Sequence, residues 1–119
     1  MNLRMPQEQL VRLVHDLGRE LAEVRQLARR LSDLLPRRYQ DLLREYHHLS
    51  GSYRDRVCLQ DPRYQRTIDE LIAIRARAMQ LKIKYETHVM LFQARQSLRF
   101  RLATKFPVQG IPKRRYKSK

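Results

Sequence analysis

Residues 6–35 read PQEQLVRLVHDLGRELAEVRQLARRLSDLL, the stretch with the clearest periodic pattern in the chain. Its apolar residues alternate spacings of four and three without a break. This heptad pattern is typical of helices that pack side by side along a continuous apolar seam. We therefore expect a helix over 6–35 whose core or oligomer seam consists of Leu10, Val14, Leu17, Leu21, Val24, Ala28, Leu31 and Leu35.

A second apolar row accompanies this seam. Leu13, Leu27 and Leu34 recur in steps of seven, with Glu20 as the one polar residue in the row. A stripe of this width is typical of a helix in a bundle, which contacts two neighbours, rather than of a two-stranded coil. We predict an all-α fold in which long antiparallel helices form a helical bundle or a coiled-coil-like assembly.

Prolines and glycines suggest where the helices begin and end. Pro6 suits the first turn of a helix, where its missing N–H costs nothing. Pro36 is expected to end or kink the first helix, because it cannot donate a hydrogen bond to the preceding turn. A second helix is predicted over 37–59, with a kink or short break near Gly51.

A third helix is predicted over 62–105. Asp61 supplies a side-chain oxygen for the first free N–H groups, and Pro62 suits the first helical position. The apolar residues of this helix spread over more than one face, so only partners on two sides could cover them. With the two preceding helices it completes one predicted domain, residues 1–106.

A competing pattern lies inside this third segment. Apolar and charged residues alternate over 81–85 and again over 98–102, which is the period of a half-buried strand. A hairpin built from residues 81–102 is therefore an alternative. We favour a helix, because no Gly, Pro, Asn or Asp between the two pieces provides a tight turn.

Positive charge is concentrated at the C-terminal end. The formal net charge is +14, yet the first 86 residues contribute only +5, and no acid follows Glu86. Residues 107–119 contain two prolines, a glycine and five basic residues, and we expect them to form a flexible basic tail. A strongly basic end favours a polyanionic partner. The candidate nucleic-acid-binding residues are Arg95, Arg99, Arg101, Lys105, Lys113, Arg114, Arg115, Lys117 and Lys119.

Two other groups of residues have simpler interpretations. Six arginines lie near the acidic residues Glu20, Glu23 and Asp33 in the sequence. This proximity favours surface ion pairs over a further surface that binds phosphates. The six are Arg19, Arg25, Arg29, Arg30, Arg37 and Arg38. A ladder of Tyr39, Tyr46 and Tyr53 repeats every seven residues and favours packing over base stacking. Phe100, Phe106 and Tyr116 lie among the basic residues, where aromatic rings can stack on exposed bases. The alternative for Phe100 and Phe106 is that they belong to the core.

The sequence contains no recognisable catalytic or metal-binding motif. The four histidines lack the spacing of a zinc helix, the three glycines cannot build a phosphate-binding loop, and no nucleophile elbow is present. We expect no enzymatic activity, no metal and no cofactor. The single cysteine, Cys58, excludes an internal disulfide framework and suits a reducing compartment. Without a predicted membrane span or signal peptide, the expected location is the cytoplasm.

These features lead to one main hypothesis and two alternatives. The chain is expected to be an accessory nucleic-acid-binding protein that forms a homo-oligomer, with DNA and RNA both open as ligands. One alternative is a helical adaptor or inhibitor that docks on an acidic partner protein. The other is a membrane-surface anchor formed by the basic C-terminal end.

Overall fold

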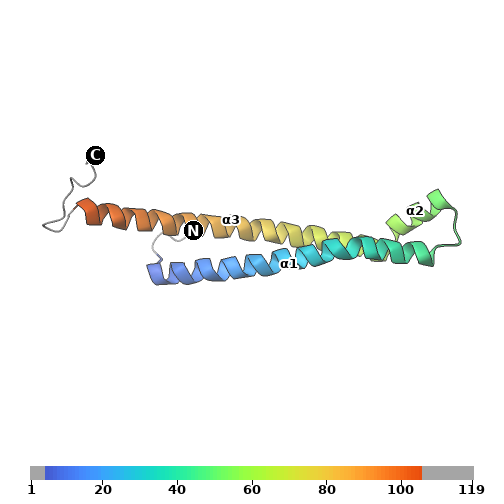
Figure 1. The fold of residues 1–119 in the computed structure, drawn as a ribbon, viewed down its shortest axis with the longest axis horizontal. Helices are drawn as coiled ribbons and strands as arrows, with labels where there is room; N and C mark the ends of the chain where they lie inside the picture. The colour runs from blue at the N-terminus through green and yellow to red at the C-terminus, as the bar shows by residue number, and fades with distance from the viewer. Residues whose placement is uncertain (1–4, 106–119) are drawn as a thin grey trace, which may run out of the picture.

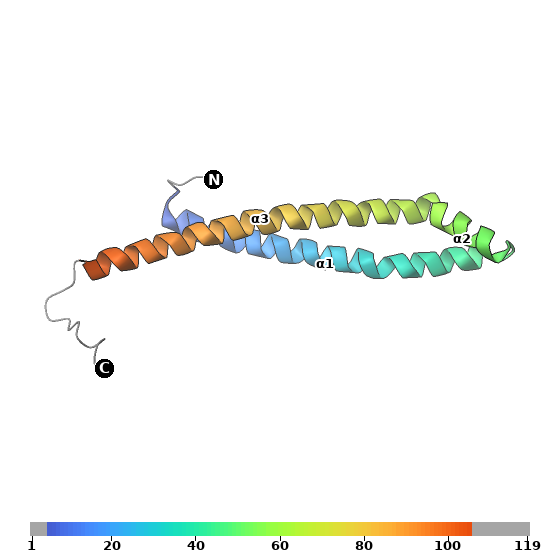
Figure 2. The ribbon, with the colours of Figure 1, turned by 90° about the horizontal axis from the view of Figure 1, so that it is seen from above.

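The computed structural model describes residues 5–105 and contains three α-helices and no strand in that range. Helix α1 spans Gln7–Glu45, α2 spans Gly51–Gln60 and α3 spans Pro62–Lys105. Figures 1 and 2 show α1 and α3 side by side along most of their length, with α2 at the closed end of this hairpin. The prediction of long antiparallel helices is confirmed. Because residues 81–102 lie inside α3, the strand hairpin is excluded.

The apolar seam of α1 packs against α3 of the same chain. Leu17 and Leu21 form a buried cluster with Leu81, and Leu10 is fully buried. The other predicted seam residues are half-buried: Val14, Val24, Ala28, Leu31 and Leu35. The seam is therefore covered within the chain, and contact between chains would require a different surface.

Helix α3 carries a matching seam, which the sequence pattern alone does not separate from the other apolar residues of this helix. Starting at Thr67, buried and half-buried residues again alternate spacings of four and three: Thr67, Leu71, Ile74, Ala78, Leu81, Tyr85, His88 and Phe92. His88 is buried in this seam, and its Nδ1–H donates a hydrogen bond to the Lys84 carbonyl at 2.7 Å. The two seams together explain why the hairpin forms.

Gly18 lies in the middle of α1, far from any helix end. A Cβ atom at this position would lie 3.0 Å from Cε1 of Tyr85, closer than most side chains can approach. The missing side chain therefore provides the space in which the Tyr85 ring packs against α1. This close approach offsets the helix propensity that a glycine lacks.

The predicted helix end at Pro36 is wrong, because α1 continues through this residue to Glu45. Pro36 is exposed, whereas Leu35 before it is half-buried and Leu42 after it is buried. Packing on both sides of the proline outweighs the cost of a proline inside a helix, about 3 kcal/mol for the lost hydrogen bond and the clash of the ring together. Tertiary contacts thus override a local signal, as they often do for helix propensity.

The predicted second helix, 37–59, is divided between two elements. Its first part belongs to α1, the chain leaves the helix over residues 46–50, and Gly51 is the first residue of α2. Cys58 of α2 is fully buried, and the Tyr39 hydroxyl of α1 donates to Asp55 of α2 at 3.2 Å. These contacts hold α2 against the closed end of the hairpin.

Asp61 caps α3 as the sequence predicts. Its Oδ1 accepts a hydrogen bond from the Arg63 backbone N–H at 2.8 Å, and Pro62 occupies the first helical position. The Asp61 side chain is only 4% exposed. It also accepts hydrogen bonds from the Arg63 guanidinium and from the Tyr46 hydroxyl, the latter at 2.9 Å. The Arg63 guanidinium also donates hydrogen bonds to the Glu45 carboxylate. These contacts join the end of α1 to the start of α3 and to Asp61, the residue between α2 and α3.

The electrostatics of this corner follow from these hydrogen bonds. Those from Arg63 hold the pKa of Asp61 well below its usual range, although burial alone would raise it. The same arginine lowers the pKa of Glu45. The hydrogen bond to Asp61 raises the pKa of the Tyr46 hydroxyl. The corner is a structural joint in which a buried carboxylate is fully partnered.

Candidate nucleic-acid interface

The open end of the hairpin is fixed by Arg95. Its guanidinium donates to the Met5 carbonyl and, at 3.3 Å, to Oε1 of Gln7. The start of α1 therefore lies at the level of Arg95 on α3. Beyond this level α3 has no part of α1 beside it.

Residues 96–105 form the last part of α3, which we call the C-terminal extension. At ~1.5 Å per residue it continues for roughly 15 Å beyond the start of α1. Figures 1 and 2 show this segment, in orange and red, projecting past the blue beginning of α1. Every side chain of the extension that the structure describes is exposed.

The structure places the predicted basic residues in three different settings. Arg95 is half-buried and engaged with the start of α1, so it does not join an exposed row of charges. Arg99 and Arg101 are exposed on the extension. Lys105 is the last residue of α3, and its side chain lies outside the described part of the chain. The predicted tail, with Lys113, Arg114, Arg115, Lys117 and Lys119, lies outside the described residues as well.

Apolar side chains accompany the two arginines. Leu98, Phe100 and Leu102 are 56%, 70% and 50% exposed. Phe100 is therefore not part of the hairpin core, and its ring is accessible from solvent. Phe106 and Tyr116 lie outside the described residues.

The sequence of the extension contains no acidic residue, because the last acid of the chain is Glu86. The hairpin, in contrast, contains acidic residues that pair with arginines, for example Glu20 with Arg77 and Glu45 with Arg63. The extension therefore combines exposed side chains with a basic sequence that lacks acidic residues. This combination is what a phosphate backbone attracts.

Most of the predicted ion pairs on α1 are absent. Arg19 pairs with Asp16 at 3.1 Å, and Glu20 pairs instead with Arg77 of α3 at 2.5 Å. Within residues 5–105 the remaining arginines of that group form no ion pair: Arg25, Arg29, Arg30, Arg37 and Arg38. All five are exposed, so α1 adds positive potential along the hairpin.

The tyrosine ladder is divided between packing and exposure. Tyr39 packs near Tyr64, with ring centroids 5.9 Å apart, and Tyr46 binds Asp61. Tyr53 is 50% exposed, with the Arg56 guanidinium 6.0 Å from its ring centre. All three tyrosines therefore lie at the closed end of the hairpin, where Tyr39 and Tyr46 contact other side chains of the corner and Tyr53 is largely exposed.

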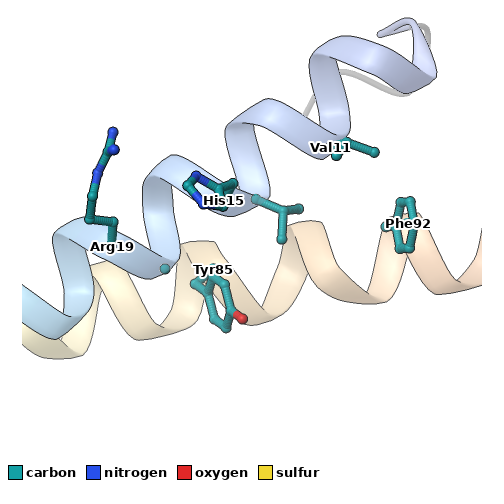
Figure 3. Close-up of a pocket in the computed structure, with 7 residues that line it drawn as sticks. Val11, His15, Arg19, Tyr85 and Phe92 are labelled. Atoms are coloured by element: carbon teal, nitrogen blue, oxygen red, sulfur yellow. The ribbon is translucent and has the colours of Figure 1, made fainter.

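A groove of about 610 Å³ lies between α1 and α3 near the open end. Figure 3 shows Tyr85 and Phe92 on α3 and Val11 on α1 around it, with Arg19 pointing away from α3. Val14, His15 and Gly18 complete the lining. The surface is mainly apolar and provides no nucleophile paired with a base, so we assign it no chemistry.

Other chemically reactive side chains do not converge. Burial raises the pKa of the Cys58 thiol, which keeps the reactive thiolate scarce. His47 and His48 are exposed neighbours. Within residues 5–105, no three His, Cys, Asp or Glu side chains are placed to hold a metal ion. No described helix has the length and apolar character that a membrane crossing requires.

The geometry defines the class of protein: a basic antiparallel hairpin of two long helices, in which α3 extends beyond α1. No protein family model matches the chain, and comparisons with curated proteins and with solved structures find no similar protein. The charge and the geometry of the chain are therefore the features from which we infer its function.

Proposed function

We propose that this chain is a non-enzymatic accessory nucleic-acid-binding protein, active as an oligomer. It would contact phosphates through the C-terminal extension and the basic residues that follow it in the sequence. The observation that carries the proposal is the C-terminal extension, whose side chains are exposed and which projects beyond α1. Neither the extension nor the sequence that follows it contains an acidic residue.

The binding energy would come mainly from counterion release. Each phosphate that Arg99 or Arg101 neutralises frees condensed cations from the nucleic acid, so affinity falls steeply as salt rises. The exposed ring of Phe100 offers a stacking surface for unpaired bases. Phosphate contacts position a protein but carry no sequence information, so we expect weak sequence preference.

Oligomerisation would strengthen this weak surface. A second copy adds a second basic end, and two linked contacts on one polymer gain avidity without any new interaction. The seam of α1 is already occupied by α3, so the association would use another face of the hairpin.

A salt series tests the proposal directly. Fluorescence anisotropy with labelled duplex DNA, single-stranded DNA and RNA should show binding whose logarithm falls linearly with the logarithm of salt concentration. The double variant Arg99→Gln/Arg101→Gln should lower affinity and reduce the magnitude of the salt slope by about 2 per chain, close to one for each lost phosphate contact. Removal of residues 107–119 should weaken binding further.

The matched control is Arg37→Gln/Arg38→Gln, which removes the same charge from exposed arginines of α1. If this control weakens binding as much as the extension variant, the interface is not at the extension. Binding that is independent of salt, or absent at physiological ionic strength, contradicts the proposal. Purification with one stoichiometric protein partner that resists nuclease would favour the adaptor function instead.

A further inference from the structure

A row of exposed apolar side chains runs along the outer side of α3. It consists of Ile72, Met79, Ile83 and Met90, which we call the outer stripe. Their exposed fractions are 61%, 56%, 58% and 67%, respectively. An apolar row of this length on a soluble helix indicates a contact surface.

The outer stripe lies opposite the α3 seam. With ~3.6 residues per turn, its mean direction differs by roughly 150° from that of the seam residues that face α1. Figures 1 and 2 show α1 along one side of α3 and no other described element along the opposite side. Helix α3 is thus apolar on two faces, and the described chain covers only one of them.

The spacing within the outer stripe is symmetric. Its members are separated by seven, four and seven residues, so the centre of the row falls at the level of Leu81. A second α3 laid antiparallel about this level places Ile72 against Met90 of the second copy. The same rotation places Met79 against Ile83 of the second copy, and both contacts then occur twice. A surface that matches itself under a two-fold rotation is what an isologous dimer requires.

The charged residues beside the stripe fit the same arrangement. Glu86 continues the spacing of the stripe and falls opposite Ala76 of the second copy, whose small side chain leaves room for it. Arg75 of the second copy is adjacent to that alanine. Within residues 5–105 neither Arg75 nor Glu86 forms an ion pair, and both are exposed. Lys82 lies near the two-fold axis, one turn from Glu86 of its own helix, which offsets its charge.

We propose that the outer stripe of α3 binds the outer stripe of a second copy of this chain, antiparallel and centred at Leu81, to form a four-helix dimer. This inference deepens the proposed function, which requires an oligomer, by naming the face that forms it. Two features favour a second copy over an unrelated protein: the self-matching spacing of the stripe, and the exposed Glu86 and Arg75, which this spacing would bring together across the dimer.

The oligomeric state is measured first, without nucleic acid. Light scattering on nuclease-treated protein at high salt should give twice the chain mass of 14.5 kDa. The variant Met79→Glu/Ile83→Glu should give a single-chain mass while circular dichroism still reports a helical protein. The control Val11→Glu/Leu27→Glu, at exposed apolar positions of α1, should remain a dimer. A wild-type monomer, or a stripe variant that stays dimeric, overturns the inference.

The orientation is measured by disulfide formation in a Cys58→Ala background. Mixed chains carrying Ile72→Cys and Met90→Cys should cross-link to each other, because these positions face one another in the antiparallel dimer. Chains carrying Ile72→Cys alone should not cross-link, since the two copies of residue 72 are roughly 27 Å apart along the helix at ~1.5 Å per residue. Cross-linking of Ile72→Cys alone would indicate a parallel dimer and overturn the proposal. A dimer that binds no nucleic acid would contradict only the proposed function.

Discussion

At the scale of single residues, the Asp61 side chain carries three roles that are normally separate. It caps α3, it is the buried partner of the Arg63 guanidinium, and it accepts the Tyr46 hydroxyl. A carboxylate that is 4% exposed is stable only because every one of these donors is present. Replacing the charge while keeping the shape isolates the ionic part of this joint.

The variant Asp61→Asn should lower the free energy of unfolding by about 1–3 kcal/mol, because the Arg63 guanidinium loses its buried anionic partner. Asparagine is also a good N-cap, so α3 should still start at the same residue. Urea denaturation at a fixed protein concentration measures the change. The control Asp41→Asn removes an exposed ion pair with Arg44 and should have little effect. Equal losses in both variants would contradict a special role for Asp61.

The pH dependence of stability follows from the same residue. The folded-state pKa of Asp61 is below its ordinary value, so the unfolded chain takes up a proton first as the pH falls. The stabilisation is complete above the ordinary pKa of ~4 and is lost as the pH falls toward the folded-state pKa. Wild-type stability should therefore fall more steeply below pH ~4 than that of Asp61→Asn. Parallel curves for the two proteins would contradict this assignment.

At the scale of the helices, Pro36 shows where local sequence rules stop. The start of α3 could be predicted because a capping aspartate and a proline at the first helical position act within one turn. The continuation of α1 could not, because it depends on tertiary packing that half-buries Leu35 and buries Leu42 on either side of the proline. The heptad of α3 was present in the sequence, but a second apolar row on the same helix obscured it.

Replacing Pro36 by alanine should stabilise the protein. Alanine restores the backbone hydrogen bond to the Ser32 carbonyl and removes the ring from the helix interior, a gain of up to about 3 kcal/mol. The urea midpoint should rise while the slope of the transition stays constant. Pro62→Ala is the matched control, because the first helical position has no such bond to gain. A lower midpoint for Pro36→Ala would show that the proline has a required bend.

At the scale of the whole molecule, the sequence predicted where positive charge is concentrated but not which basic side chains are exposed together. It placed the basic residues at the C-terminal end. Of those that the structure describes, Arg95 contacts the start of α1, and Arg99 and Arg101 lie on the exposed extension. This difference arises because α1 begins beside Arg95 of α3, so that only the residues after Arg95 extend beyond α1. No local sequence pattern predicts where along α3 the helix α1 begins. The same pairing left the outer stripe uncovered, so the charge and the proposed dimer surface occupy different parts of α3.

The two proposals together set a length scale for binding. In the antiparallel dimer the C-terminal extensions lie at opposite ends, with their last residues roughly 72 Å apart at ~1.5 Å per residue. A two-fold axis perpendicular to such a rod matches the dyad axes of duplex DNA. At ~3.4 Å per base pair, a duplex of about 10 base pairs can reach one extension, whereas one of about 30 can reach both.

Wild-type protein should therefore bind the longer duplex roughly a hundredfold more tightly than the shorter one, because the second contact becomes intramolecular. The dimer variant Met79→Glu/Ile83→Glu should lose most of this ratio while keeping its affinity for the short duplex. Val11→Glu/Leu27→Glu introduces the same negative charge without touching the outer stripe and should keep the ratio. Anisotropy titrations of the three proteins on both duplexes measure it. A ratio that is unchanged in the stripe variant would mean that avidity does not arise from this dimer, since only the linkage between the two basic ends distinguishes the variants.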